Sequence, residues 1–464
     1  MNRGSKRTGI TVKKVLIANR GEIALRAVRA CNALDIRSVA VHSEPDAASP
    51  HVWAASQAVC IGPASSTQSY LNVDALLHVA CATGCDAVYP GYGFLAENAD
   101  FAERCATEGL IFVGPEADTI RLMGDKAAAR SAALRHGVPV VRGSDGAVRE
   151  ADNIQELVEQ IGFPVLIKAS AGGGGRGMRI ARSAEEFGAL FAQASREAQQ
   201  AFGDPAVYLE RFVSNVRHIE VQVFGDGKGN AVHVGERDCT VQRRHQKLLE
   251  EAPSPVLNSE ERARIHDSAL RLTAGVNYRG AGTVEFIFDA ATREFFFIEM
   301  NTRIQVEHPV SEMLTGADLV AEQFRIARGE GISVGPPAAD CGHAIEFRIN
   351  AEAFRHDFRP SPGRITRWEP PRGPGIRVDG FVAAGSTVQP YYDSMLAKLI
   401  VHGTDRGHAL ERARAALATF MVEGIDTTID LHRALVRDPE FAVSGIHTKW
   451  VEESFLPQLF ERET

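Results

Sequence analysis

The sequence predicts a chain of mixed α/β and α+β class, and three features support this prediction. Short apolar strands alternate with helices over residues 13–113, a glycine-rich loop separates two strands near residue 172, and short strands with Gly and Pro turns precede two helices after residue 336. Alternating strands and helices are typical of a parallel sheet with covered faces, whereas strands followed by helices are typical of an α+β module. The length of 464 residues leaves room for roughly two to four domains.

Composition and charge exclude several classes of protein. The formal net charge of −8 argues against a general nucleic-acid binder, and no run approaches the ~18 consecutive apolar residues of a membrane span. The basic N-terminus leads into a short strand rather than an apolar segment, so we expect no signal peptide. Seven cysteines, odd in number and scattered, favour reduced thiols. We therefore expect a cytoplasmic protein with no nucleic-acid or membrane partner.

The N-terminal part alternates between strand and helix. We expect strands at 15–18, 38–42, 86–90 and 110–114, with helices at 22–34, 71–83 and 97–108. The loop after the first strand lacks the glycines of a dinucleotide fingerprint. The loop 91–98 follows a strand end, and a ligand loop and a tight two-glycine turn are equally open for it. Residues 118–136 are predicted to form one helix, and nothing local decides whether its Lys126 has a function.

A glycine-rich loop lies between the strands 163–168 and 178–181. Its Gly172-x-Gly174-x-x-Gly177 pattern matches a dinucleotide motif weakly, because a strand rather than a helix follows, and no P-loop Gly-Lys-Ser/Thr is present. Four consecutive glycines carry an entropy cost that a passive turn does not require. We therefore favour a flexible lid whose backbone N–H groups close over phosphates, with Lys168 ending the first strand.

The segment 283–309 is predicted to form a charged hairpin. If Asp289 pairs with Phe295 across a five-residue loop at 290–294, Glu285 lies opposite Glu299, with Cβ atoms roughly 5 Å apart. Two facing carboxylates in an apolar ribbon require a cation between them, and with Asn301 they offer the oxygen ligands that suit Mg²⁺. The alternative is a solvated hairpin edge with scattered acids; the apolar run around the acids favours the metal site.

Two further segments carry charge. The run 236–251 concentrates Arg243, Arg244, His245 and Lys247, and it could be a solvated face or the anion-binding wall of the site beyond the hairpin. In the C-terminal part, alternation predicts that Ile345, Phe347 and Ile349 face a core, so that Glu346 and Arg348 share the opposite face. Helices are expected at 406–420 and near 427–436.

Several long motifs together resemble one family. KASAGGGGRGM, ERDCTVQRRHQKLLEEAP, GAGTVEF, IEMNTRIQVEHPVSEMLTG, FRPSPG and PYYDSMLAKL occur in this order between about residues 15 and 452. They resemble the biotin carboxylase component of biotin-dependent carboxylases, in the ATP-grasp superfamily. The resemblance implies a Rossmann-like N-terminal domain at 1–117, an ATP-grasp domain at 118–335 with a mobile lid at about 141–213, and a mixed α+β C-terminal domain at 336–464.

The resemblance also implies roles for individual residues. Those implied to hold the ATP phosphates are Lys126, Lys168, Gly174 and Gly175. Those implied to form the rest of the nucleotide pocket are Glu210, Arg211, Phe212, Val213, His218, Gln242, His245 and Ile287. Mg²⁺ or Mn²⁺ would bind Glu285, Glu299 and Asn301. Bicarbonate would lie among Lys247, Arg303, Gln305, Val306 and Glu307. Biotin would lie near Arg348, Tyr92 and Gly93.

The implied activity is the ATP-dependent carboxylation of biotin with bicarbonate, through carboxyphosphate. Glu307 is the implied general base, with Arg303, Lys247 and Arg348 as the other catalytic residues. This is the first half-reaction of a carboxylase such as acetyl- or propionyl-CoA carboxylase, an enzyme of fatty acid biosynthesis. No Met is followed by Lys, so the biotinylation motif is absent. We expect a biotin carboxyl carrier protein and a carboxyltransferase as separate subunits, and a homodimer by analogy with the family.

Two other functions remain open. Another ATP-grasp ligase, joining an acyl phosphate to an amine, shares the lid, lysines and metal carboxylates. The Arg-x-Gln-x-Glu-His run, with Lys247 and Arg348, favours bicarbonate and biotin instead. A non-catalytic nucleotide-binding subunit would be expected to lose Glu307, Lys247 or Arg348, and all three are present. The final acceptor of the carboxyl group cannot be inferred.

Overall fold

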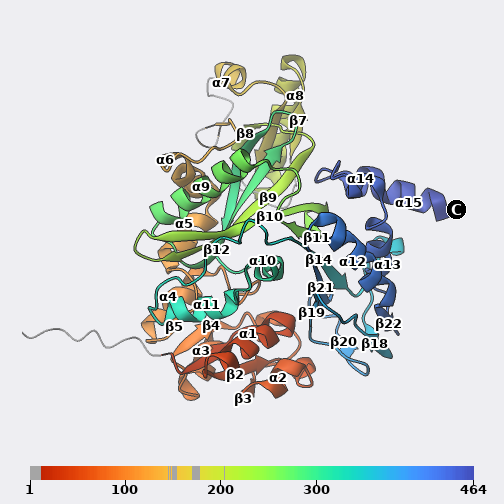
Figure 1. Cartoon of the computed structure of the whole chain (residues 1–464). Coiled ribbons are helices and arrows are strands. Elements are labelled where there is room, and N and C mark those ends of the chain that lie inside the picture. Colours follow the sequence, from red (N-terminus) through yellow and green to blue (C-terminus); the bar gives the residue numbers. More distant parts are fainter. Residues whose placement is uncertain are drawn as a thin grey trace, which may run out of the picture.

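The computed structural model describes residues 12–144, 146, 148, 154–169, 178–202 and 204–463. Among these residues the strands form one sheet of five strands, one of eight, one of three and three of two. In Figure 1 the N-terminal elements lie at the bottom, α7 (Ile154–Ile161) and α8 (Ala184–Phe202) at the top, and the C-terminal helices at the right. The strands of the eight-stranded sheet run through the middle of the molecule.

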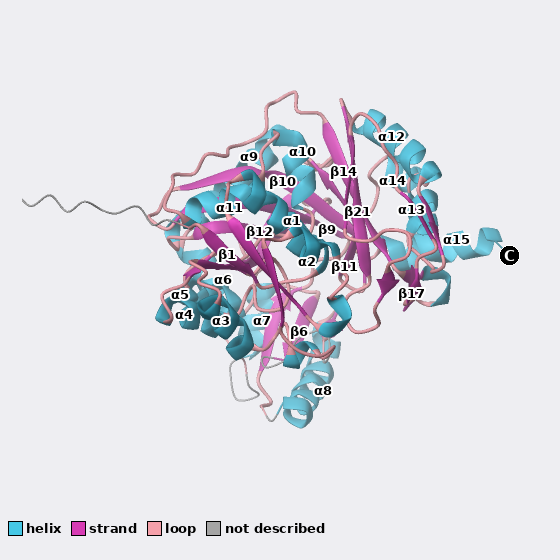
Figure 2. Ribbon diagram, turned by 90° about the horizontal axis from the view of Figure 1, so that it is seen from below, coloured by secondary structure: helices cyan, strands magenta, loops and turns pink. Residues whose placement is uncertain are grey.

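The N-terminal sheet is parallel, as predicted. Its order is β3-β2-β1-β4-β5. The strands are β1 (Lys14–Ile17), β2 (Arg37–His42), β3 (Gln57–Cys60), β4 (Ala87–Tyr89) and β5 (Ile111–Phe112). Because side chains alternate along a strand, Val15 and Ile17 face one core and Leu16 faces another. The helices that cover the two faces are α1 (Gly21–Ala33) with α11 (Leu319–Ala327), and α3 (Val73–Ala82) with α4 (Ala99–Thr107). Figure 2 shows α11 beside α1, although 286 residues separate their ends in the sequence (319 − 33).

The eight-stranded sheet, here called the large sheet, is antiparallel throughout and has the order β13-β12-β9-β10-β11-β14-β21-β19. In chain order its strands are β9 (Val216–Asp226), β10 (Ala231–Arg243), β11 (Gln246–Ala252), β12 (Arg279–Asp289), β13 (Glu294–Asn301), β14 (His343–Asn350), β19 (Ile376–Gly380) and β21 (Met395–Gly403). One continuous sheet therefore joins the charged hairpin to the C-terminal strands.

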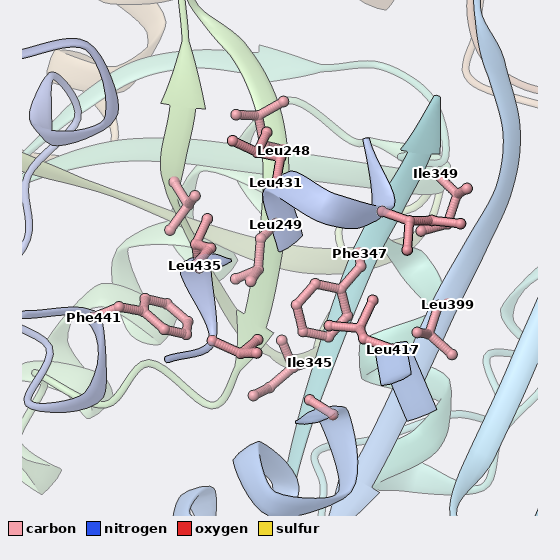
Figure 3. Packing of buried hydrophobic residues seen from close by; sticks show 14 of the residues in the cluster. Leu248, Leu249, Ile345, Phe347, Ile349, Leu399, Leu417, Leu431, Leu435 and Phe441 are labelled. Carbon is pink, nitrogen blue, oxygen red and sulfur yellow. The ribbon is translucent and has the colours of Figure 1, made fainter. Parts of the chain in front are cut away.

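One face of the large sheet is apolar. Over β9 and β12 it is covered by α9 (Ser259–Gly275), and over β14 and β21 by α12 (Arg406–Thr419). Figure 3 shows Ile345, Phe347 and Ile349 of β14 among the side chains of this core, with Leu399 of β21 close by. The predicted core face of residues 345–349 is confirmed. Glu346 and Arg348 consequently share the other face.

The opposite face of the large sheet is polar and largely buried. Alternation along β9 and β12 sets the apolar Val221 and Phe286 toward the core, and the neighbouring polar side chains toward this second face. The charged residues on this face include His218, Glu220, Lys247, Glu250, Glu285, Glu346, Arg348 and Lys398, from β9, β11, β12, β14 and β21. Antiparallel sheets often expose such a face to water. In this protein, neighbouring elements cover most of the polar face and leave a cavity beside it.

The three-stranded sheet, with α7 and α8 beside it, lies in the region predicted to be the lid and is called the lid sheet. Its order is β7-β6-β8, with β6 (Val165–Ala169), β7 (Arg179–Ala181) and β8 (Val207–Arg211). Val165, Ile167 and Leu209 form a small core with apolar side chains of α7 and α8. The predicted lid glycines Gly174 and Gly175 lie outside the described residues.

Shorter elements complete the chain. The remaining helices are α2 (Pro50–Ala54), α5 (Ala117–Gly124), α6 (Lys126–Arg135), α10 (His308–Thr315), α13 (Ile429–Leu435), α14 (Pro439–Ala442) and α15 (Leu456–Glu463), with 3₁₀ turns at Glu44–Asp46, Ser66–Gln68 and Phe354–His356 and a π-helical turn at Val451–Phe455. The remaining strands are β15 (Glu352–Ala353), β16 (Arg359–Pro360), β17 (Gly363–Arg364), β18 (Arg367–Glu369), β20 (Thr387–Val388) and β22 (Met421–Glu423). Within the described part of the chain, no helix has the length and apolar character needed to cross a membrane.

The prediction of one helix over 118–136 is wrong. The segment forms α5 and α6, and Asp125 separates them with an extended backbone (ψ 115°). The Asp125 side chain accepts a hydrogen bond of 2.8 Å from the Ala128 N–H and so caps α6. Lys126 is therefore the first residue of a helix rather than a residue inside one.

The hairpin prediction is right at the carboxylates and wrong at the turn. Glu285 lies directly opposite Glu299, as predicted. However, Asp289 pairs with Glu294 rather than Phe295, so the loop has four residues, 290–293, and a bulge between Glu285 and Phe286 restores the register. The turn closes with Arg293 in the left-handed region (φ 61°).

The charged run 236–251 is a hairpin rather than a solvated face. It forms most of β10 and β11, joined through Arg244 and His245, both at positive φ. Arg237 and Glu250 are fully buried, whereas the tip at Arg244 is exposed. The interpretation of this run as a solvated surface is therefore wrong for its strands.

Candidate active site

A cavity of about 1090 Å³ lies between the polar face of the large sheet, the N-terminal loops and the C-terminal part. It gathers predicted residues that are up to 256 positions apart (348 − 92). The predicted residues that line it are Tyr92, Gly93, His218, Gln242, His245, Lys247, Glu285, Ile287, Glu299, Asn301, Arg303, Gln305, Val306 and Arg348. The structure thus brings together most of the predicted metal, bicarbonate and biotin residues.

Glu285 is the most heavily bonded carboxylate in this wall. Its Oε1 accepts hydrogen bonds from Asn301 Nδ2 (2.7 Å) and Gln305 Nε2 (2.8 Å), and its Oε2 lies 2.9 Å from His218 Nε2. Burial alone would raise the pKa of Glu285, but Lys247 and His218 lower it well below the usual range. Glu285 is consequently ionised over the physiological pH range.

Glu299 faces Glu285 across the hairpin. Burial raises the pKa of Glu299, and the charge of Glu285 raises it further. This repulsion is what a bound divalent cation relieves, and the carboxylate oxygens with the nearby Asn301 amide are hard ligands. Asn301 directs its Nδ2 to Glu285 and its Oδ1 to Arg303 Nη2, 2.9 Å away. The donor set fits Mg²⁺ or Mn²⁺, which Glu285, Glu299 and Asn301 would hold.

Glu307 lies at the start of α10 and is fully buried between two cations. Its Oε1 accepts a hydrogen bond of 2.6 Å from Lys247 Nζ, and its Oε2 accepts one of 2.9 Å from Arg348 Nη2. Burial would raise the pKa of Glu307, but Lys247 and Arg348 lower it well below its usual range. The site therefore holds an ionised carboxylate beside two donors that reach the cavity.

Three side chains hold Arg303 in place. Its Nε donates to Glu97 Oε2 (2.9 Å), its Nη1 to Gln305 Oε1 (2.8 Å) and its Nη2 to Asn301 Oδ1. Although burial lowers the pKa of Arg303, Glu97 raises it above the usual value. Glu97 comes from the N-terminal loop, so that loop positions a cation of the central site.

The loop 91–98 is both a tight turn and a wall of the cavity. Gly91 and Gly93 adopt positive φ (67° and 68°), which favours glycine. Asn19 Nδ2 donates to the Tyr92 carbonyl (2.8 Å), and the Tyr92 hydroxyl donates to Glu22 Oε2 (2.6 Å). The loop is therefore a tight two-glycine turn that also lines the cavity, and its role as a ligand loop stays a prediction.

Sequence reasoning missed several buried partners of the site. Glu97 accepts from Arg303, Glu22 accepts from the Tyr92 hydroxyl, and Lys398 donates to the Val306 carbonyl. Lys398 is a single cation inside the apolar strand β21 and is fully buried. Such a lysine in an apolar strand is the signal that could have identified it.

The predicted nucleotide residues of the lid lie apart from this cavity. Lys168 forms an ion pair with Glu210 between β6 and β8, and Arg211 ends β8. The Phe212 ring lies 5.6 Å from Lys449 Nζ, Val213 follows it, and Lys126 is exposed at the start of α6. No described residue of the lid sheet lines the cavity. Their roles in nucleotide binding remain predictions.

Three family models match the chain. Residues 11–120 match the biotin carboxylase N-terminal domain, 125–334 the ATP-binding domain of the carbamoyl-phosphate synthase L chain, and 346–453 the biotin carboxylase C-terminal domain. The chain is 51% identical over 441 residues to biotin carboxylase of Nostoc sp., covering 95% of this chain and 98% of the relative. It is 50% identical over 442 residues to biotin carboxylase 1 of Bacillus subtilis, with the same coverage.

Solved structures of biotin carboxylases are also similar to this chain. A biotin carboxylase–βγ-ATP complex from Campylobacter jejuni has a TM-score of 0.87 at 43% identity, covering 95% of this chain and 99% of that one. The biotin carboxylase domain dimer of Hydrogenobacter thermophilus 2-oxoglutarate carboxylase, bound to MgADP, ADP and bicarbonate, has a TM-score of 0.86 at 46% identity, covering 95% and 97%. The predicted fold, activity and ligand classes are confirmed by these matches. The chain belongs to the biotin carboxylase family of ATP-grasp enzymes, which carboxylate biotin with ATP and bicarbonate.

Proposed function

We propose that Glu307 is the general base of this biotin carboxylase and that the reaction runs through carboxyphosphate. The observation that carries the proposal is the position of the Glu307 carboxylate, 2.6 Å from Lys247 Nζ and 2.9 Å from Arg348 Nη2 in a buried wall. An ionised carboxylate accepts the bicarbonate proton, and the bicarbonate oxygen then attacks the γ-phosphate of ATP.

The neighbouring side chains hold the bicarbonate. Arg303 presents a planar fork of donors that suits a carboxylate or bicarbonate, and Gln305 is bonded to it at 2.8 Å. Lys247 adds a cation, and the Val306 backbone closes this end of the site. Bound Mg²⁺, held by Glu285, Glu299 and Asn301, would neutralise charge on the phosphates.

Biotin binds at the other end of the cavity. Arg348 would donate to the ureido oxygen and stabilise its enolate-like charge while the phosphate released from carboxyphosphate removes the ureido proton. Tyr92 and Gly93 line the same end of the cavity. The two substrates thus meet between Arg303 and Arg348.

The nucleotide would lie under the lid. The proposed phosphate ligands are Lys126, Lys168, Gly174 and Gly175. The proposed pocket for the rest of the nucleotide comprises Glu210, Arg211, Phe212, Val213, His218, Gln242, His245 and Ile287. Because no described residue of the lid sheet lines the cavity, this proposal requires the lid to close over ATP.

The partners follow from the same chemistry. We propose a homodimer that acts on a separate biotin carboxyl carrier protein and supplies a carboxyltransferase subunit, as in acetyl- or propionyl-CoA carboxylase. The proposed domains are 1–117, 118–335 and 336–464. The seven free thiols support a reducing, cytoplasmic location.

The test is ATP hydrolysis stimulated by free biotin in the presence of bicarbonate and Mg²⁺. Glu307→Gln should lower this rate about 10²- to 10⁴-fold, the range for a lost general base, while Glu330→Gln, on an exposed loop, should keep it. MgADP should bind both variants alike. A Glu307→Gln enzyme with the full rate would refute the assignment. A wild-type rate that ammonia stimulates and biotin does not would favour an amine ligase.

A further inference from the structure

Two buried glutamates face each other behind Arg348. Glu250 of β11 and Glu346 of β14 are direct partners in the antiparallel register, so their side chains leave the same face of the large sheet with Cβ atoms roughly 5 Å apart. Both residues are 0% exposed. Two ionised carboxylates at this separation, away from water, repel each other strongly.

The two carboxyl groups have unequal partners. Arg348 Nε and Nη2 both lie close to Glu250 Oε1, at 2.6 and 2.5 Å. In contrast, both oxygens of Glu346, and Oε2 of Glu250, find no hydrogen-bond donor among the described residues. Buried carboxylate oxygens are almost always hydrogen-bonded. A proton on one oxygen of Glu346 would give Glu250 Oε2 a donor and would remove one of the two buried charges.

The other groups around Glu346 do not replace that proton. On β21 the residue opposite Glu346 is the apolar Ile400, and the nearest cation, Lys398, directs its Nζ to Glu22 Oε1 and to the Val306 carbonyl, both at 2.9 Å. From α10 the neighbouring core side chains include Val310. Arg348 also lowers the pKa of Glu346 electrostatically, but its hydrogen bonds go to Glu250 and Glu307, and Glu307 is an anion that adds to the repulsion.

The structure assigns to Glu346 a proton that it donates to Glu250, so that the pair carries one negative charge and positions Arg348 for biotin. In this arrangement Glu250 uses one oxygen for Arg348 and the other for Glu346. The pKa values agree with the geometry: burial raises the pKa of Glu250 to about 7 and that of Glu346 well above its usual value. The arginine-bound Glu250 is the member that ionises.

The single negative charge on the Glu250–Glu346 pair affects how Arg348 meets biotin, and this consequence rests on the proposed role of Arg348. Its guanidinium already contacts Glu307 and Glu250. A second charge on the glutamate pair would reduce the positive potential that the guanidinium presents to the ureido oxygen. Glu346 is therefore a positioning residue that acts through Glu250.

The proton can be observed without catalysis. The infrared difference spectrum between the wild type and Glu346→Gln, recorded in D₂O at neutral pH, should contain the C=O band of a protonated carboxylic acid that the variant lacks. Glu369→Gln, exposed on β18, is the control and should retain the acid C=O band. The absence of the acid band in the wild type would overturn the proposal, whatever the enzyme does with biotin.

The positioning role has a kinetic test. Because Gln keeps an N–H donor, Glu346→Gln should retain kcat/KM for free biotin within about twofold at neutral pH. If loss of the Glu346 proton lowers kcat/KM at alkaline pH in the wild type, that decline should be absent from the variant. Glu346→Leu keeps the volume but no donor, and its kcat/KM for biotin should fall about tenfold, the effect of one lost buried hydrogen bond, with MgADP affinity unchanged. Equal losses in both variants would overturn the positioning role. A wild type that biotin does not stimulate would instead refute the proposed function while leaving the infrared result intact.

Discussion

Arg303 and Glu97 join the central site to the N-terminal part, because Arg303 Nε donates a hydrogen bond of 2.9 Å to Glu97 Oε2. The other oxygen of Glu97 accepts from the Thr302 N–H at 3.0 Å, so one carboxylate fixes both the backbone and the guanidinium of this segment. The proposed bicarbonate site therefore depends on a residue more than 200 positions earlier in the chain (303 − 97).

Glu97→Gln should weaken bicarbonate binding. The amide keeps one acceptor but loses the charge that orients Arg303, so the KM for bicarbonate should rise about tenfold, with the KM for ATP nearly unchanged. Steady-state kinetics with bicarbonate varied measure this effect. The control is Glu103→Gln on the exposed side of α4; an unchanged KM in Glu97→Gln would contradict the positioning of Arg303 by Glu97.

Glu299→Gln should change stability and metal binding in opposite directions. Removing one of two facing carboxylates relieves their repulsion, so the metal-free Tm should rise. The metal-dependent increase in Tm should shrink, because a ligand is lost. Thermal unfolding with and without Mn²⁺ in the presence of ADP measures both, with Glu294→Gln at the exposed turn as the control. A lower metal-free Tm would argue against repulsion between the pair.

Lys398→Met should destabilise the protein strongly. The change leaves Glu22 buried without its cation and the Val306 carbonyl without its donor, and breaking a buried pair costs about 3–5 kcal/mol. Urea denaturation measures the loss. The double variant Lys398→Met with Glu22→Gln should recover part of it; a double variant that is less stable than Lys398→Met would contradict this account.

Glu251 should make the fold sensitive to acid. The Oε2 atom of Glu251 lies 2.8 Å from His343 Nε2 and 2.7 Å from Arg406 Nε. Burial would raise the pKa of Glu251, but these two partners lower it from 4.5 to about 2. Its folded pKa is depressed, so its contribution is present above the unfolded pKa and is lost as pH falls from about 4.5 to about 2. The shift corresponds to about 3 kcal/mol.

Unfolding midpoints in urea measured between pH 6 and pH 3 test this prediction. The wild type should lose stability more steeply than Glu251→Gln, which has no carboxyl group to protonate at this site. The matched control is Glu411→Gln on the exposed face of α12. Parallel pH curves for wild type and Glu251→Gln would show that this ion pair does not govern the acid response.

Local periodicity predicted those parts of the site in which neighbouring residues determine the geometry. The shared face of Glu346 and Arg348 follows from alternation along a single strand, whereas Glu285 faces Glu299 because the bulge offsets the one-residue error in the predicted turn. The turn register was wrong because the bulge after Glu285 has no local signature. The break at Asp125 was missed because an aspartate is compatible with a helix interior as well as with a cap.

The missed residues are those whose partners are distant in the sequence. Glu250 meets Glu346 only because β11 pairs with β14. Lys398 reaches Val306 only because β21 pairs with the other edge of β14. The long motifs identified the family and its ligands, because such motifs record contacts that no single stretch reveals. They did not identify the buried charges behind the motif residues.

The antiparallel pairing that runs from β13 to β19 joins both ends of the proposed site in one sheet. The proposed metal carboxylates and the proposed biotin ligand Arg348 lie on this sheet, so strand pairing rather than the angle between two domains sets the distance between them. Severing the chain between β13 and β14 should not yield two working halves, since each fragment would inherit an unprotected edge and only one end of the chemistry.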